Sequence, residues 1–429
     1  MTIELSDLTF TDQDDVVPPS GVFEVIRNTG IANTLAGNDR ITGSGIGNNG
    51  DGFDFDYGFK NEGVLNTDDG NDTITGSLTY GRFGSYGYNI VNLDTLNTGE
   101  GNDIIDGSYS NPGSYAISDG IYNPGTLNTG EGDDIITAVG TEYGLVNEDG
   151  TLNTGEGNDI ITARGGNGIN NGVAILLWGD GTINTGNGED SIIISAGGFI
   201  NLGEVFLGEG NDSLIANGSR SNDNFVENLS LENSNTIETG NGNDIITSSS
   251  TIYNRGIINT GNGEDSIISE GGFINSGRVF LGEGNDIITS TGELYNEDII
   301  NTGSGDDLIG GGVIYNNSGA IITGDGNDSI IANDGFKSGP NSSGAWFLGE
   351  GEDYIKGFGS GDFYGGNGND TLELTPGTYT VGIWGEAGES PIFTKDDQLM
   401  ITFEFEKLKA GSTIYDFTSL TAGQIITVV

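Results

Sequence analysis

The stretch NTGEGNDIITA at residues 153–163 also occurs at residues 128–138 as NTGEGDDIITA. Both copies place a turn of glycine, asparagine and carboxylates directly before two isoleucines. The copies are 21 residues apart from Asp244 to Asp328, and mostly 31 to 33 residues apart in the N-terminal half. A period of this length without helix-forming composition predicts a solenoid of short strands. Aligned on the last acid of the turn, the pattern occurs fourteen times, at Asp39, Asp72, Asp103, Asp134, Asp159, Asp190, Asp212, Asp244, Asp265, Asp286, Asp307, Asp328, Asp353 and Asp370.

Each repeat carries glycine and apolar residues at fixed distances from its aspartate. An Ile or Leu lies two residues after every aspartate, and an apolar residue lies seven residues before it. Because strand side chains alternate between faces, both columns should point inward. A glycine precedes every aspartate by two, and twelve copies have a second glycine two residues earlier, which would supply positive φ to a tight turn. Examples are Gly99 and Gly101, Gly155 and Gly157, and Gly366 and Gly368.

A second turn is marked by an asparagine eleven residues before the aspartate in ten copies, for example Asn254 and Asn275. An apolar residue two positions earlier defines a third strand. The predicted fold is therefore all-β: a right-handed parallel β-solenoid of three short strands and about 21 residues per coil. Stacked asparagines are expected to form a hydrogen-bonded ladder, so this corner is assigned no ligand site.

Composition restricts the chemistry that the chain can perform. It has a formal charge of −51, 78 glycines, no cysteine and no histidine. Disulfides, thiolate or imidazole zinc sites and histidine-based catalysis are thereby excluded. The acidic charge opposes nucleic acid and anionic membranes. The N-terminus, MTIELSDLTFTDQDD, predicts no cleaved signal peptide, and no segment is apolar enough to insert in a membrane.

Stacked turns would place carboxylates ~4.8 Å apart, where two unit charges repel by roughly 1 kcal/mol in water and about 3 kcal/mol at an effective dielectric of 20. Calcium suits such a site because it takes 6 to 8 oxygens, and the glycine turns are expected to direct carbonyls outward beside each aspartate. The alternative is that Asn and Asp are only favourable turn residues. The predicted cofactor is Ca²⁺, held by the aspartates from Asp72 to Asp370 and by the glycines at 99, 101, 155, 157, 366 and 368.

The last copy, GGNGNDTLE at residues 365–373, resembles the nine-residue unit GGxGxDxUx of the repeats-in-toxin (RTX, hemolysin-type) calcium-binding family at every defined position. The resemblance implies a calcium-loaded β-roll, exported by type I secretion and folded outside the cell. Other copies depart from the family pattern. Thr98, Thr154 and Leu207 replace the first glycine, Asp39 and Asp72 lack the upstream glycine, and each coil has one such turn where the family's β-roll has two.

The predicted domains are an N-terminal cap at 1–27, the calcium-binding solenoid at 28–370 and a small C-terminal β cap at 371–429. The repeat stops near Thr371, where TLELTPGTYTVGIWG predicts strand, turn and strand. A cap would cover the core and strand edge of the last coil. The C-terminal segment also resembles the secretion regions of RTX proteins, which implies an uncleaved export signal there.

The function predicted is that of a secreted, extracellular or cell-surface calcium-binding rod, and not of an enzyme. Its role would be structural or adhesive, in a surface layer or extracellular matrix, and end-to-end self-association into filaments is left open. One alternative is a carbohydrate-active β-helix enzyme, a lyase or epimerase, which needs carboxylates beside Lys or Arg. Others are ice binding by the threonine column five residues before the aspartate, and glycan or cell-surface binding by aromatic insertions. These aromatics are Phe53, Phe55, Tyr57, Tyr80, Phe83, Tyr86, Tyr88, Tyr109 and Tyr115.

Overall fold

The computed structural model describes residues 2–18, 24–47, 56–80, 86–108, 117–166, 173–218, 229–339, 344–385 and 390–429. The chain forms two compact units, Met1–Gly240 and Asn241–Val429, and each is described by itself. The predicted boundaries at residues 27 and 370 stay predictions. Phe53, Phe55, Phe83, Tyr109 and Tyr115 lie outside the described residues, as does the side chain of Tyr80.

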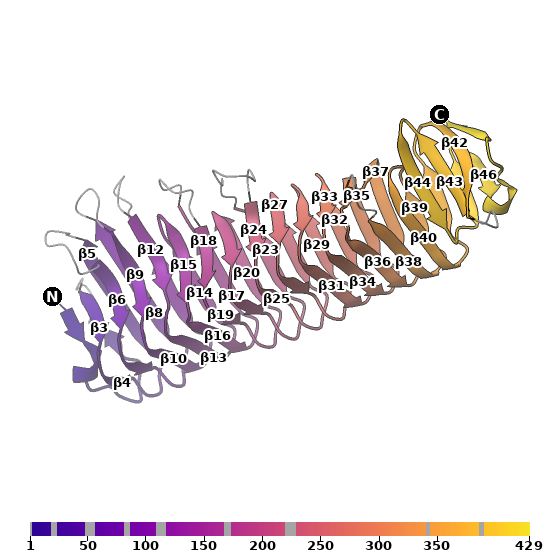
Figure 1. The fold of residues 1–429 in the computed structure, drawn as a ribbon. Helices are drawn as coiled ribbons and strands as arrows, with labels where there is room; N and C mark the ends of the chain where they lie inside the picture. Colours follow the sequence, from indigo (N-terminus) through magenta and orange to yellow (C-terminus); the bar gives the residue numbers. More distant parts are fainter. Residues whose placement is uncertain are drawn as a thin grey trace. The chain divides into compact units, whose positions relative to one another are not determined.

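The first unit stacks coils of three strands, one strand on each side of the coil (Figure 1). The first side contains β3 (Val25–Asn28), β6 (Asp56–Asn61), β9 (Tyr86–Asn92), β12 (Ile117–Tyr122), β15 (Tyr143–Glu148), β18 (Val173–Trp178), β21 (Gly198–Asn201) and β24 (Leu229–Asn233). The second contains β4 (Ile31–Asn33), β7 (Val64–Asn66), β10 (Thr95–Glu100), β13 (Thr126–Glu131), β16 (Thr151–Glu156), β19 (Thr182–Asn184), β22 (Glu204–Phe206) and β25 (Thr236–Glu238). The third contains β5 (Arg40–Gly47), β8 (Thr73–Tyr80), β11 (Ile104–Ser108), β14 (Ile135–Val139), β17 (Ile160–Arg164), β20 (Ser191–Ala196) and β23 (Ser213–Ala216).

The N-terminal residues of this unit pair with its first coil. Strand β1 (Thr2–Glu4) runs parallel to β3, and β2 (Val16–Val17) runs parallel to β5. The 3₁₀ turn η1 (Leu5–Asp7) connects to the first of these strands and buries Leu5. The strand edge that begins the stack is therefore covered by the chain itself.

The second unit is also built of coils with three sides. One side contains β26 (Ile245–Ser248), β29 (Ser266–Ser269), β32 (Ile287–Ser290), β39 (Tyr354–Lys356) and β41 (Thr371–Leu374). Another contains β27 (Thr251–Asn254), β30 (Phe273–Asn275) and β33 (Leu294–Asn296). The remaining side contains β28 (Ile257–Asn259), β31 (Arg278–Glu283), β34 (Ile299–Ser304), β36 (Ala320–Asp325), β38 (Ala345–Gly351) and β40 (Gly361–Gly368). Strand β35 (Leu308–Asn316) spans two sides, because it pairs with both β32 and β33. It pairs in turn with β37 (Ser329–Lys337).

The end of the second unit changes from parallel to antiparallel pairing. Strands β42 (Gly377–Trp384), β43 (Ser390–Lys395), β44 (Gln398–Phe403) and β47 (Ile425–Val428) pair antiparallel, as do β45 (Lys407–Ala410) and β46 (Thr413–Asp416). The 3₁₀ turn η2 (Phe417–Ser419) precedes β47. Strands β44 and β45 pair parallel with β40 and β41, so they occupy the edge that the last coil would otherwise expose.

The core consists of the apolar columns that the repeat predicted, including the one on the third strand, whose members Ile121, Ile252, Phe273 and Leu294 are fully buried. Leu96, Leu127 and Leu152 lie in register on the strands that enter the turn, and Ile105, Ile136 and Ile161 lie in register on the strands that leave it. All six are fully buried. The strands pair parallel throughout the coils, so the all-β parallel solenoid is confirmed.

The glycine turns leave no room for a side chain. Gly263 has φ +147°, and a Cβ at that residue would lie 1.7 Å from the carbonyl oxygen of Gly242 in the preceding coil. The carbonyl oxygen of Gly242 therefore lies next to Gly263 in the following coil, and the outward direction of the turn carbonyls stays a prediction. Where the upstream glycine is missing, Leu35 (φ +69°) and Asp68 (φ +62°) adopt the left-handed conformation instead.

Candidate metal centre

The fourteen aspartates form a buried hydrogen-bonded ladder within each unit. In twelve of them, from Asp72 to Asp212 and from Asp265 to Asp370, the Oδ1 atom accepts a hydrogen bond from the backbone N–H of the repeat aspartate one coil earlier. Asp134 N–H donates to Asp159 Oδ1 over 2.8 Å, and Asp265 N–H donates to Asp286 Oδ1 over 2.8 Å. The carboxylate therefore accepts the hydrogen bond of a backbone N–H in the turn, in place of a backbone carbonyl. The same hydrogen bond, from the N–H of the first aspartate to Oδ1 of the second, forms the other rungs of the ladder: Asp39 to Asp72, Asp72 to Asp103, Asp103 to Asp134, Asp159 to Asp190, Asp190 to Asp212, Asp244 to Asp265, Asp286 to Asp307, Asp307 to Asp328, Asp328 to Asp353 and Asp353 to Asp370.

The ladder continues to both terminal segments through residues that the repeat did not predict. Asp15 N–H donates to Asp39 Oδ1 at the N-terminal end, over 2.8 Å. At the C-terminal end Glu406 Oε2 accepts from Asp370 N–H over 2.7 Å. Glu406 lies outside the repeat, so its role depends on tertiary structure that no local pattern in the sequence signals.

The second carboxylate oxygen is the unusual feature of the ladder. In twelve of these aspartates Oδ2 is buried and has no hydrogen-bond partner, although a buried acceptor without a donor costs free energy. The exposed fraction of each of these side chains is 2% or less. The residues are Asp39, Asp72, Asp103, Asp134, Asp159, Asp190, Asp265, Asp286, Asp307, Asp328, Asp353 and Asp370.

The threonine five residues before the aspartate lies inside the turn. Thr98 and Thr260 are fully buried, and each hydroxyl donates to a carbonyl of the next coil, Thr98 Oγ1 to Thr129 O over 3.1 Å and Thr260 Oγ1 to Leu281 O over 3.3 Å. A hydroxyl has one proton, so that proton is not available to Oδ2. The ice-binding expectation for this column is wrong, because the threonines do not face solvent.

Burial raises the pKa of the ladder carboxyls above the ordinary aspartate value of 3.8. The pKa rises to about 6 at Asp134 and Asp265, where the nearby threonine hydroxyl partly opposes the effect of burial. It rises to about 7 at Asp286 and Asp353, where Leu281 and Leu348 replace the threonine, but also at Asp103, where Thr98 is present, so burial is the main cause in both kinds of turn. A proton or a cation is thus favoured beside the ladder.

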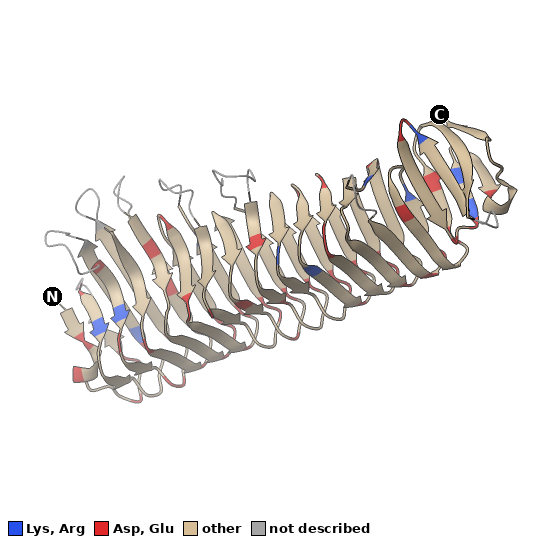
Figure 2. Ribbon diagram, in the orientation of Figure 1, with Lys and Arg blue, Asp and Glu red and all other residues tan. Residues whose placement is uncertain are grey.

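Outside the buried ladder, the turn carries exposed acids and amides. Asn158 N–H donates to Asp133 Oδ1 over 2.9 Å, and Asp306 N–H donates to Asn285 Oδ1 over 2.7 Å, so the residue before each aspartate forms a second ladder. Exposed carboxylates such as Glu156 and Glu283 lie two residues further upstream. Figure 2 shows acidic residues recurring along the turns of each unit.

The turn offers only hard oxygen donors to a metal: carboxylates, hydroxyls and backbone carbonyls. Among the described residues no three Asp or Glu side chains come close enough together to hold a metal ion by themselves. Carbonyl and hydroxyl oxygens would have to complete the shell around Oδ2, which calcium accepts and softer metals do not. The predicted aspartates from Asp72 to Asp370 share this environment, although Asp212 and Asp244 also make further interactions.

The predicted glycine ligands have the backbone conformation that the turn requires. Gly99, Gly155 and Gly366 have φ between +101° and +106°. Gly101, Gly157 and Gly368 have φ between +134° and +156°. Their stacking is therefore structural in the first place, and a ligand role for their carbonyl oxygens stays a prediction.

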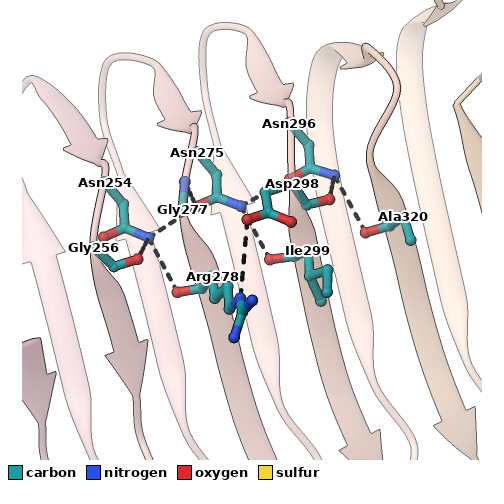
Figure 3. Close-up of polar contacts among 9 residues, drawn as sticks. All are labelled: Asn254, Gly256, Asn275, Gly277, Arg278, Asn296, Asp298, Ile299 and Ala320. Carbon is teal, nitrogen blue, oxygen red and sulfur yellow. Dashed lines mark hydrogen bonds and ion pairs between the residues drawn. The ribbon is translucent and has the colours of Figure 1, made fainter. Parts of the chain in front are cut away.

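The asparagine corner is a neutral ladder, as the repeat indicated. Asn254 Nδ2 donates to Asn275 Oδ1, and Asn275 Nδ2 donates to Asn296 Oδ1, both over 2.8 Å (Figure 3). Each amide also donates to a carbonyl of the next coil, as Asn275 does to Ile299 O over 3.0 Å. Two ladder members lie one residue away from the spacing of eleven: Asn316 is the ladder residue where the count gave Asn317, and Asn147 joins the ladder in a coil where the count gave no asparagine.

Fold and site together define an all-β parallel solenoid with two buried polar ladders. No family model matches the chain, and no curated protein matches it. Among solved structures the chain is similar to a hyperactive, Ca²⁺-dependent, β-helical antifreeze protein from an Antarctic bacterium, with 17% sequence identity, a TM-score of 0.44 and 96% of each chain covered. A likeness this distant transfers neither a ligand nor an activity. No helix in the described part of the chain is long and apolar enough to cross a membrane.

Proposed function

We propose that the protein is an extracellular structural solenoid that is stabilised by calcium at its aspartate turns. The observation that carries the proposal is the repeated Asp Oδ2 atom, which is buried and has no hydrogen-bond donor. A cation beside this oxygen would offset the desolvation of the carboxylate and the repulsion between neighbouring rungs. The formal charge of −51 makes such neutralisation a condition of stability near neutral pH.

The chain's own groups fit an oxygen-binding cation. In each turn the aspartate carboxylate and the turn carbonyls would supply ligands. Turns such as those of Asp103 and Asp159 would add the exposed acid three residues upstream and the threonine hydroxyl as further hard oxygens. Calcium would supply positive charge at this site and would take no part in a reaction. Zinc and copper prefer cysteine or histidine ligands. Because the sequence contains neither residue type, its turns favour calcium over these metals.

Calcium-coupled folding would suit a protein that is secreted unfolded, because the acidic chain repels itself until ions are abundant. A surface-layer, matrix or adhesive role and type I export rest on the resemblance of residues 365–373 to the RTX repeat, and they are part of this proposal. The role is structural rather than enzymatic. End-to-end association would need free strand edges, and β44 and β45 already occupy those of β40 and β41.

The test is far-UV circular dichroism of chelator-treated protein at pH 7.5, titrated separately with calcium and with magnesium. The expected result is a large loss of β signal, or a strong fall in Tm, after chelation, with recovery in calcium at lower concentration than in magnesium. Calcium bound per chain is measured in the same samples.

A protein that keeps its fold and Tm in chelator, and retains no calcium after gel filtration, would contradict the proposal. The ladder would then be held by protons rather than by metal.

A further inference from the structure

The outward face of the first unit has a hollow that the calcium turns do not involve. It has a volume of about 260 Å³ and lies over β9, β12, β15 and β18. A second hollow of about 520 Å³ adjoins it and shares Tyr88 and Tyr122. The smaller hollow is lined by Tyr86, Tyr88, Asp119, Tyr122, Tyr143, Val146, Glu148, Leu176 and Trp178.

Aromatic rings make up most of the wall. The rings of Tyr88 and Tyr122 stack with centroids 5.1 Å apart, and Tyr86 packs edge-on against Tyr88 at 5.4 Å. Trp178 ends β18 with 56% of its surface exposed, an unusual position for the largest apolar side chain. Glu148 pairs in register with Trp178, so a carboxylate and an indole lie side by side at the mouth.

The polar groups of the hollow accept hydrogen bonds more than they donate them. Tyr86 donates its hydroxyl proton to Asp119 Oδ2 over 2.7 Å, and Tyr122 donates to Glu148 Oε2 over 2.7 Å. Asp119 is 2% exposed and also receives the Tyr143 N–H at 3.3 Å. With two hydroxyl protons directed at carboxylates, the hollow presents carboxylate oxygens and ring faces to a ligand.

We propose that this hollow binds a small organic ammonium ion, held by the faces of Trp178 and the tyrosines and by the carboxylates of Asp119 and Glu148. Aromatic faces attract cations, and rings combined with carboxylates are a recognised means of holding ammonium groups. Among the described residues none that lines this smaller hollow is Lys or Arg, whereas Arg27 and Lys60 line the adjoining larger one. An anionic ligand would meet two carboxylates and no counter-charge, and a neutral sugar would find few donors for its hydroxyl oxygens.

Choline is the probe, and its neutral carbon isostere 3,3-dimethylbutan-1-ol is the matched control ligand. Each is titrated into the folded, calcium-saturated protein at constant ionic strength, followed by calorimetry and by tryptophan fluorescence. Choline is expected to saturate a single site, and the isostere to bind at least tenfold more weakly, because it lacks the charge that the rings and carboxylates attract.

Two variants and one control locate the site. Trp178→Ala and Glu148→Gln should each weaken choline binding by roughly tenfold. Trp384→Ala should leave it unchanged, since Trp384 is 54% exposed but lies in the second unit, outside the hollow. Circular dichroism of each variant in calcium checks that the fold is intact.

Equal binding of choline and its isostere would overturn the inference, as would an equal loss in Trp384→Ala, competition by glucose, or no saturable binding of choline. Because every titration is made on folded protein, these outcomes do not depend on whether the ladder holds calcium.

Discussion

Both buried corners of the coil stack one polar side chain on the next, but the asparagine side chain is neutral and the aspartate side chain is anionic. At the asparagine corner, each amide has donors and an acceptor, so Asn275 accepts from Asn254 and donates to Asn296 and to Ile299 O. At the aspartate corner, Asp286 accepts one N–H through Oδ1 and leaves Oδ2 without a donor. The neutral ladder is complete by itself, whereas the anionic ladder needs a proton or a cation from outside the chain.

The largest expected effect is that of pH on the ion-free protein. The folded pKa of ladder carboxyls such as Asp134 and Asp286 is raised to about 6 to 7, above the ordinary 3.8. The folded state then binds more protons than the unfolded state between roughly pH 4 and pH 7, so stability should fall as pH rises through that window. A shift of about two units corresponds to roughly 3 kcal/mol per carboxyl.

Thermal unfolding in chelator from pH 4 to pH 8 measures this dependence. In saturating calcium the sign should reverse, because protons then compete with the metal. A Tm that is independent of pH in chelator would show that the ladder carboxyls do not titrate between the two states.

The second-largest expected effect is that of a substitution that disrupts the asparagine ladder. Asn275→Asp would remove the donors to Asn296 Oδ1 and Ile299 O and bury a charge at a corner built without one. The expected loss is about 3–5 kcal/mol in the free energy of unfolding at pH 7, measured by denaturant titration in calcium. Ser276→Ala at the exposed neighbouring position is the control and should change stability little. An unchanged midpoint for Asn275→Asp would mean that the two corners tolerate charge alike.

The smallest effect distinguishes turns with threonine from turns with leucine. In Asp265→Asn the new Nδ2 can donate to the Thr260 hydroxyl oxygen, whereas in Asp286→Asn the residue at that position is Leu281. In chelator at pH 7, Asp265→Asn should gain about 1 kcal/mol and Asp286→Asn should gain less. Both should lower the calcium bound per chain. Identical shifts in Tm for the two variants would argue against a contact between the threonine and the carboxyl.

Much of the fold follows from the repeat, because inward columns such as Leu96 and Ile105 repeat with the period of one coil. The positions of Asn147 and Asn316 were not predictable from a fixed count, since the strand and corner lengths before them differ from coil to coil. The direction of the aspartates was also not predictable. Spacing gives their stacking, but only tertiary structure shows that Oδ1 accepts from the backbone N–H of the preceding coil and that Oδ2 is buried without a hydrogen-bond partner.

The acidic aromatic hollow on the first unit was missed for a similar reason. Only Tyr86 and Tyr88 of its aromatics belong to the predicted insertions, whereas Tyr122, Tyr143 and Trp178 lie on the paired strands β12, β15 and β18. Only the parallel register brings Trp178 beside Glu148, thirty residues away in sequence.

The measurement that tests the central claim most directly is an X-ray structure of protein crystallised in calcium, with anomalous difference maps collected for that element. The account predicts a repeated column of anomalous peaks at coordination distance from Oδ2 of ladder aspartates such as Asp265, Asp286 and Asp307. Ordered turns with no anomalous peak beside any of these oxygens would contradict it, and would assign the neutralisation of the ladder to protons.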